Sequence, residues 1–145
     1  MVSKDFITAG KATFTLELPH EWASAHRCKP HYTYKVRKKV GNDGRPVFFV
    51  SILSGPNNES DYRYIGILTF DGQVKTTAKS ALHAESMPVR LLNRSLRLVW
   101  QGDATAMEEA GFQLHHEGKC GHCGRKLSTP ESLRTGFGPK CRGDF

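Results

Sequence analysis

The C-terminal part of the chain is organised by the stretch Cys120-Gly121-His122-Cys123-Gly124 and by Cys141, which follows Cys123 after 17 intervening residues. Two cysteines separated by two residues and followed by glycine predict a tight knuckle turn, in which both sulfurs point inward and backbone amides donate to them. Zinc in structural sites takes four tetrahedral ligands, with sulfur about 2.3 Å away. We therefore predict a Zn²⁺ ion bound by Cys120, Cys123 and Cys141.

Three cysteines require a fourth ligand, and His116 is the preferred candidate, giving the pattern H-x3-C-x2-C-x17-C. The neighbouring His115, the knuckle residue His122 and Asp144 are weaker candidates. His122 is poorly placed as a ligand, because a residue between knuckle cysteines usually points outward. Four protein ligands leave no open position for substrate or water, so the expected role of the metal is structural.

A short helix is expected between the two halves of this site. Ser128 or Thr129 can cap it, and Pro130 fits its first turn. Gly136 can end it after a single turn.

The composition is that of an ordinary globular chain, with 145 residues, 38% hydrophobic and 24% charged. Four cysteines, three of them near the C-terminus, favour metal ligands over a disulfide framework. The first residues lack the apolar stretch of a signal peptide, and no run approaches the roughly 18 apolar residues of a membrane span. We expect a cytoplasmic protein without a membrane partner.

The first 77 residues predict a small antiparallel sheet of four or five strands. Alternation of apolar and polar residues, short apolar runs and turn signals such as Asp71-Gly72 indicate strands. The expected strands are Thr13–Leu18, Tyr32–Val40, Val47–Leu53, Tyr62–Phe70 and Val74–Thr76. Ser54 to Asp61 is expected to be a polar turn whose side chains bond their own backbone.

The period then changes to that of a helix. Val89, Leu92 and Leu96 recur on one face between Met87 and Trp100, and Pro88 suits the first turn. A strand over Leu96 to Trp100 is the alternative, because apolar residues also alternate there. Asp103 can cap a second short helix that Gly111 ends.

The charge distribution indicates polyanionic partners. The formal charge is +7, and His115 to Phe145 holds six basic and three acidic residues. Such a field favours polyanionic partners. The expected partner is nucleic acid, DNA rather than RNA, and a host or phage protein is the other candidate. The candidate nucleic-acid-binding residues are Arg125, Lys126, Arg134, Lys140 and Arg142 in the tail, and the stripe Arg90, Arg94 and Arg97 on the expected helix.

A second basic group lies on the strand Tyr32 to Val40. Lys35, Arg37 and Lys39 alternate there with Tyr32 and Tyr34, which invites a platform for stacked bases. The alternation sends the tyrosines to the core side, so a solvated strand face is at least as good an interpretation.

The motif from Cys120 to Cys141 resembles C-x2-C-G-R-x-L-T-x-P-x-S-I-x-x-G-x-G-P-x-C, which occurs in small, largely uncharacterised phage and bacterial proteins. His116-Glu117-Gly118-Lys119 is similar to the H-E-G-R that precedes the knuckle in a phage and plasmid subgroup. Ser128 stands where threonine is usual, and Leu133 where isoleucine is usual. Segments upstream, from Ala9 to Thr15 and from Phe49 to Tyr62, look like the same subgroup. The resemblance implies zinc and a phage or mobile-element origin, and implies no reaction.

These observations predict an α+β fold with a small antiparallel β-sheet, one or two helices and a C-terminal zinc finger of the knuckle or treble-clef type. The expected units are residues 1–112 and residues 113–145. The leading function is a non-enzymatic, zinc-containing nucleic-acid-binding accessory protein. The alternatives are a protein-binding module that captures or inhibits a host or replication enzyme, and a metal-dependent nuclease. No pairing of a nucleophile with a base emerges, so no catalytic residue is assigned.

Overall fold

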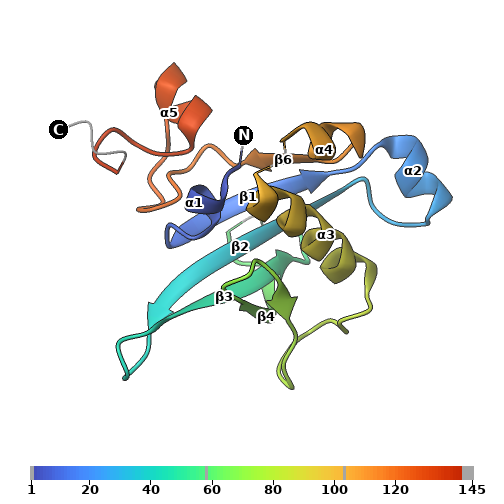
Figure 1. Cartoon of the computed structure of the whole chain (residues 1–145), viewed down its shortest axis with the longest axis horizontal. Coiled ribbons are helices and arrows are strands. Elements are labelled where there is room, and N and C mark those ends of the chain that lie inside the picture. Colours follow the sequence, from blue (N-terminus) through green and yellow to red (C-terminus); the bar gives the residue numbers. More distant parts are fainter. Residues whose placement is uncertain (1, 58, 103, 142–145) are drawn as a thin grey trace.

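The computed structural model describes residues 2–57, 59–102 and 104–141. It is an α+β fold, as predicted, built on one curled antiparallel sheet of six strands in the order β5-β4-β3-β2-β1-β6 (Figure 1). The strands are β1 (Lys11–Glu17), β2 (His31–Val40), β3 (Pro46–Leu53), β4 (Tyr62–Leu68), β5 (Val74–Lys75) and β6 (Gln113–His116). Among the described residues, no helix has the length and apolar content needed to span a bilayer.

Alternation along β1 and β2 builds one apolar face of the sheet. Phe14 and Leu16 of β1, and Tyr34 and Val36 of β2, are buried, as their period of two predicts. Phe14 pairs directly with Tyr34 in the antiparallel ladder, and the centroids of their rings lie 5.8 Å apart. The five strands expected within the first 77 residues are confirmed.

Strand β6 was not predicted. It pairs antiparallel with β1, where Leu114 lies opposite Leu16 and His116 opposite Phe14. Residues 113–116 therefore belong to the sheet. They are also the first residues of the predicted C-terminal unit, residues 113–145. The cysteine-containing segment continues directly from this strand.

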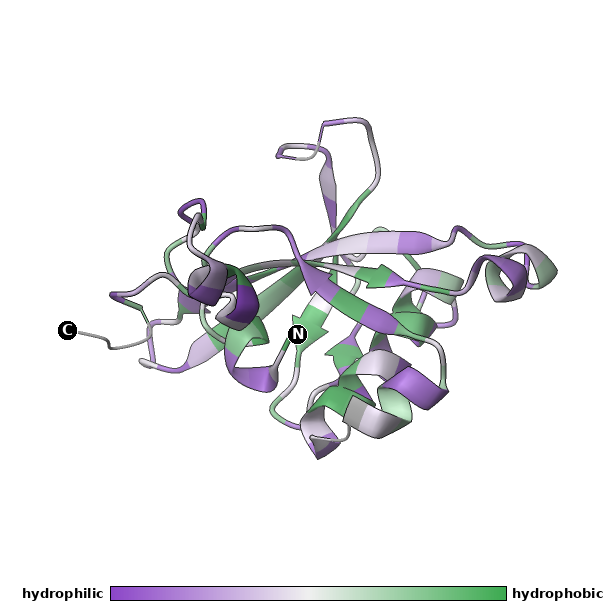
Figure 2. Ribbon diagram, turned by 90° about the horizontal axis from the view of Figure 1, so that it is seen from above, coloured by the Kyte–Doolittle hydropathy of each residue, from purple (hydrophilic) through white to green (hydrophobic). Residues whose placement is uncertain are grey.

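Helix α3 (Met87–Gln101) covers the apolar face, so the alternative of a strand over Leu96 to Trp100 is wrong. Val89, Leu92 and Leu96 are buried in the same core as the strands. Gly102 ends the helix with φ of 70°, a left-handed conformation that glycine adopts without strain. Helices α3 and α4 (Ala104–Glu109) lie together on one side of the sheet (Figure 2). The cap expected from Asp103 lies outside the described residues.

Two further short helices were not predicted. Helix α2 (His20–Ala25) follows β1, in a segment for which no helix or strand was predicted. Helix α1 (Lys4–Ile7) is capped by the Ser3 side chain, which accepts a hydrogen bond from the Phe6 amide. The Phe6 and Ile7 side chains are fully buried, so α1 joins the N-terminus to the core.

Candidate metal centre

The first half of the centre is a knuckle that directly follows β6. The Cys120 amide donates to the Arg125 carbonyl at 2.8 Å, and the Gly124 amide donates to the Cys120 carbonyl at 2.9 Å. Gly124 has φ of 79°, which lets the chain reverse without the strain a side chain would cause. This is the tight turn that the spacing of Cys120 and Cys123 predicts.

The second half is a one-turn helix, α5 (Pro130–Thr135), that returns the chain to the knuckle. The Thr129 hydroxyl accepts a hydrogen bond from the Ser132 amide, so of the two expected caps it is Thr129 that acts. Gly136 ends the helix in a left-handed conformation, as expected. The Gly136 carbonyl then accepts a 2.9 Å hydrogen bond from the Gly121 amide. This bond joins the two halves of the module.

Phe6 anchors the module on the sheet. A Cβ atom added at Gly121 or at Gly136 would lie 2.6 or 2.7 Å from Cδ2 of Phe6, so the ring rests directly against both glycines. The rings of His116 and Phe137 pack around it, each with its centroid 5.9 Å away. The module therefore docks through α1, a helix from the opposite end of the chain.

The three C-terminal cysteines come together as predicted. The sulfur atoms of Cys120, Cys123 and Cys141 all lie within 4.8 Å of one another, and no other such group occurs in the part of the chain that the structure describes. Tetrahedral bonds of about 2.3 Å to zinc would place two sulfurs about 3.8 Å apart. The three thiols are therefore close enough to bind one metal ion.

The electrostatics of the cluster favour a cation. Burial raises the pKa of the Cys120 thiol, but hydrogen bonds from the amides of Cys123, Gly138 and His122 outweigh burial and lower that pKa to about 7. Burial raises the pKa of Cys141 to about 11, with hydrogen bonds and charge from Cys120 and Cys123 acting in the same direction. Without a cation, the Cys141 thiol therefore resists ionisation beside Cys120 and Cys123. A bound metal ion would remove that resistance.

The structure gives His116 other partners. Its Nδ1 accepts a 3.0 Å hydrogen bond from the Gly118 amide, and its Nε2 contacts the Leu133 carbonyl oxygen. With Nδ1 accepting, the proton resides on Nε2 and is donated to Leu133. Nε2 therefore ties β6 to α5, while Nδ1 holds the turn that follows β6. His116 is not part of the group of mutually close metal-binding atoms. Coordination by His116 would require one of these bonds to break.

His122 lies nearer the thiols than the sequence predicts. Its Nδ1 is 3.5 Å from Sγ of Cys141, although His122, like His116, lies outside the group of mutually close metal-binding atoms. Tetrahedral bonds of about 2.3 Å to sulfur and 2.0–2.1 Å to nitrogen would separate these atoms by about 3.6 Å. The other candidates differ: His115 contacts Glu17 at 3.0 Å on the sheet, and Asp144 lies outside the described residues.

A hollow of about 560 Å³ lies over the cysteines. Its lining includes Arg125, Lys126 and Lys140, and none of the described residues that line it is acidic. The structure thus brings three of the predicted basic residues together. Arg134 instead lies 3.5 Å from Glu131 within α5, and Arg142 lies outside the described residues.

The predicted arginine stripe is exposed on α3. Arg90, Arg94 and Arg97 all reach solvent, as their helical spacing predicts. The Arg94 guanidinium lies 5.4 Å from the centre of the Phe112 ring. These arginines belong to a surface separate from the hollow over the cysteines.

One cluster was missed by the sequence interpretation. The outer face of the sheet, opposite α3, carries the half-buried aromatic side chains Phe49, Tyr62 and Tyr64 beside the cations of β2. Tyr32 and Tyr34, the tyrosines weighed above as a platform for stacked bases, point away from this face and toward the core, as expected. The signal that could have found the cluster is the period of two in Tyr62 and Tyr64.

Comparison with known proteins adds one finding. No curated protein and no solved structure matches the chain. One protein family, however, matches the C-terminal segment of the chain. This segment contains all three clustered cysteines and fits the resemblance to uncharacterised small proteins. Residues 115–145 are similar to a protein family described as a family of unknown function, DUF6011.

Proposed function

We propose that this chain is a non-enzymatic nucleic-acid-binding accessory protein whose C-terminal module is organised by a zinc ion. The observation that carries the proposal is the set of three cations, Arg125, Lys126 and Lys140, around the hollow over the cysteines. Cations gathered without an acidic neighbour attract phosphate groups. The resemblance of the cysteine motif to phage and plasmid proteins supports an accessory role in such an element, in the host cytoplasm.

Zinc is the metal that suits this donor set. Thiolate-rich, four-coordinate sites select zinc over hard cations such as Mg²⁺, which prefer oxygen ligands. The backbone amides that donate hydrogen bonds to the Cys120 sulfur would orient it as a metal ligand. Zinc bound to three thiolates and one neutral ligand leaves one negative charge, which the three cations outweigh.

We propose His122 as the fourth ligand, with its Nδ1 at the metal. This replaces His116, whose ring nitrogens bond the Gly118 amide and the Leu133 carbonyl. A closed ligand set leaves the ion no position for substrate, which supports a structural role. Contact with nucleic acid then falls to the cations, and the metal holds the two loops that carry them.

The test is a salt titration of binding to a labelled DNA duplex, measured by fluorescence anisotropy on the full, zinc-loaded chain. The triple variant Arg125→Ala/Lys126→Ala/Lys140→Ala should bind more weakly and lower the slope of log K against log salt by up to about 2.7, at 0.9 per lost phosphate contact. A matched triple variant at the exposed cations Lys29, Arg45 and Lys79 should leave affinity within about twofold.

Three outcomes would contradict the proposal. Absence of binding to DNA and RNA even at low salt would remove the nucleic-acid function. A stable protein complex that persists after nuclease treatment would favour the protein-capture alternative. Metal-dependent cleavage of the probe would favour a nuclease.

A further inference from the structure

Three aromatic side chains, those of Phe49, Tyr62 and Tyr64, form a patch on the outer face of the sheet. Phe49 of β3 and Tyr64 of β4 lie with their ring centres 6.1 Å apart, and Tyr62 stands two residues before Tyr64 on the same face. The core positions of these strands, Val50, Ile52 and Ile65, point the other way and are buried. The described helices that bury side chains in this core lie against the opposite face, so the patch faces solvent.

Cations from β2 frame the patch. Lys35 Nζ lies 3.9 Å from the centre of the Tyr62 ring, and Lys39 Nζ lies 5.7 Å from that of Phe49. Arg37, between them, is the ladder partner of Phe49 and donates to the Ala12 carbonyl. Burial lowers the pKa of Lys35, and the charges of Arg37 and Lys119 lower it further. The face thus holds like charges close together.

We propose that this outer sheet face binds single-stranded nucleic acid, with bases stacked on Phe49, Tyr62 and Tyr64 and phosphates on the β2 cations. The inference deepens the proposed function, on which it rests, by naming the class of nucleic acid. Every base has a π-face, so aromatic stacking combined with a basic surface holds single strands with little sequence preference. On binding, a base takes the place of each lysine ammonium over its ring, and the lysine turns to the neighbouring phosphate.

Single strands fit this face better than a duplex. Bases in a duplex are already stacked on each other and paired, so they present only their edges to a protein. The aromatic rings on this face can stack on bases that are free to splay outward. A duplex can use the cations alone.

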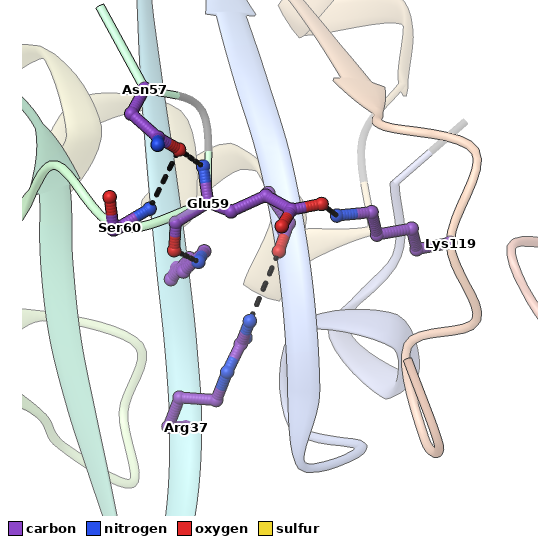
Figure 3. Close-up of polar contacts among 7 residues, drawn as sticks. Arg37, Asn57, Glu59, Ser60 and Lys119 are labelled. Carbon is purple, nitrogen blue, oxygen red and sulfur yellow. Dashed lines mark hydrogen bonds and ion pairs between the residues drawn. The ribbon is translucent and has the colours of Figure 1, made fainter. Parts of the chain in front are cut away.

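A loop between β3 and β4 reaches across to this face and supplies a competing anion (Figure 3). Asn57 Oδ1 accepts hydrogen bonds from the amides of Glu59 and Ser60, which fixes the loop in the polar turn expected from its sequence. The Glu59 carbonyl then accepts a hydrogen bond from Lys35 Nζ, and its carboxylate lies 3.9 Å from Lys119 Nζ. The Glu59 carboxylate therefore stands where a phosphate of the ligand would stand. A second acid, Glu117, is held beside the face by the Thr15 hydroxyl.

Lys119 also connects this face to the metal module. It forms a backbone bridge with Lys126, which lines the hollow over the cysteines. Cations therefore continue from the outer sheet face to the hollow. A single strand lying on the sheet can extend into the module by this route.

The experiment compares a labelled oligothymidylate of about 16 nucleotides, the upper range for one small binding fold, with a duplex of the same length. The zinc-loaded wild-type chain should bind the single strand more tightly. Phe49→Leu and Tyr64→Leu keep apolar bulk and remove a ring, so each should weaken single-strand binding at least about fivefold. Tyr64→Phe, which keeps the ring, should bind like the wild type. Glu59→Gln should strengthen binding about two- to fivefold, because it removes an exposed competing charge.

The matched control is Phe48→Leu, the same change one residue away on the core side of β3. It should leave single-strand affinity within about twofold. Undiminished single-strand binding in Phe49→Leu and Tyr64→Leu, combined with a loss in the Arg125/Lys126/Lys140 variant, would overturn this inference and leave the proposed function standing. Weaker binding in Glu59→Gln would also overturn it. Absence of binding to either probe would remove both.

Discussion

Truncation of Phe6 tests how the module is attached to the fold. Phe6 is 1% exposed and rests on Gly121 and Gly136, the backbone positions that join the two halves of the metal module. Phe6→Ala would empty the space between these glycines and the rings of His116 and Phe137. The module and α1 would lose their shared packing in one step.

The magnitude follows from the burial of the ring. Replacement of a fully buried phenylalanine by alanine costs about 3–5 kcal/mol, which includes the cavity left behind. A domain of this kind has a free energy of unfolding of about 5–15 kcal/mol, so the variant should lose a large fraction of it. With a denaturant dependence of about 2 kcal/mol per molar urea, the midpoint should fall by about 1.5–2.5 M.

The assay is urea unfolding of the zinc-loaded chain, followed by circular dichroism, with Phe70→Ala as the matched control. Phe70 is 95% exposed, so the same change there should shift the free energy of unfolding by less than about 0.5 kcal/mol. Zinc content without urea should remain unchanged in both variants, because Phe6 provides no ligand. A loss below 1 kcal/mol in Phe6→Ala, or equal effects of the two variants, would refute the assignment of Phe6 as the anchor.

The remaining predictions concern the metal centre. Because Cys141 has a pKa of about 11, metal binding releases its proton throughout the neutral range, and below pH 7 the Cys120 proton is released as well. The apparent affinity for zinc should therefore rise with pH. Log K should increase by at least about one per pH unit from pH 7 up to the Cys141 pKa, and by at least about two per pH unit below pH 7. A chelator competition that gives a flat profile would exclude thiolate ligation. His122→Ala should weaken metal affinity while leaving the stability of the metal-free chain unchanged. His116→Ala should retain the metal and lose about 1–3 kcal/mol of stability through the lost bonds to Leu133 and Gly118; the reverse pattern in the same two assays would make His116 the ligand.

The sheet could be predicted because its signals are local. Alternation placed Phe14 and Tyr34 in the core, and the period of the α3 segment placed Leu92 and Leu96 there. The caps of α5 were equally readable, because Thr129 and Gly136 act within one turn of chain. Each of these features depends on residues that are close in sequence.

The features that were missed depend on distant partners. Strand β6 is four residues long and includes His115 and His116, so it carries no alternating pattern, and it forms because the edge of β1 accepts it. The same pairing orients His116 toward α5. Phe49 lies in a run that is apolar on both faces, so the sequence could not say which side of the sheet it occupies. Helix α1 gains its place from Phe6, whose partners lie more than a hundred residues away.

Zinc binding by the cysteine cluster can be measured as the zinc content of the purified full chain, determined by native mass spectrometry beside the variants Cys123→Ser and Cys141→Ser. Cys28, which lies outside the cluster, provides the matched control as Cys28→Ser. We expect one zinc ion per chain in the wild type and in Cys28→Ser, and loss of the ion in the two cluster variants. A wild-type chain that binds no zinc, or cluster variants that keep a full equivalent, would contradict this expectation.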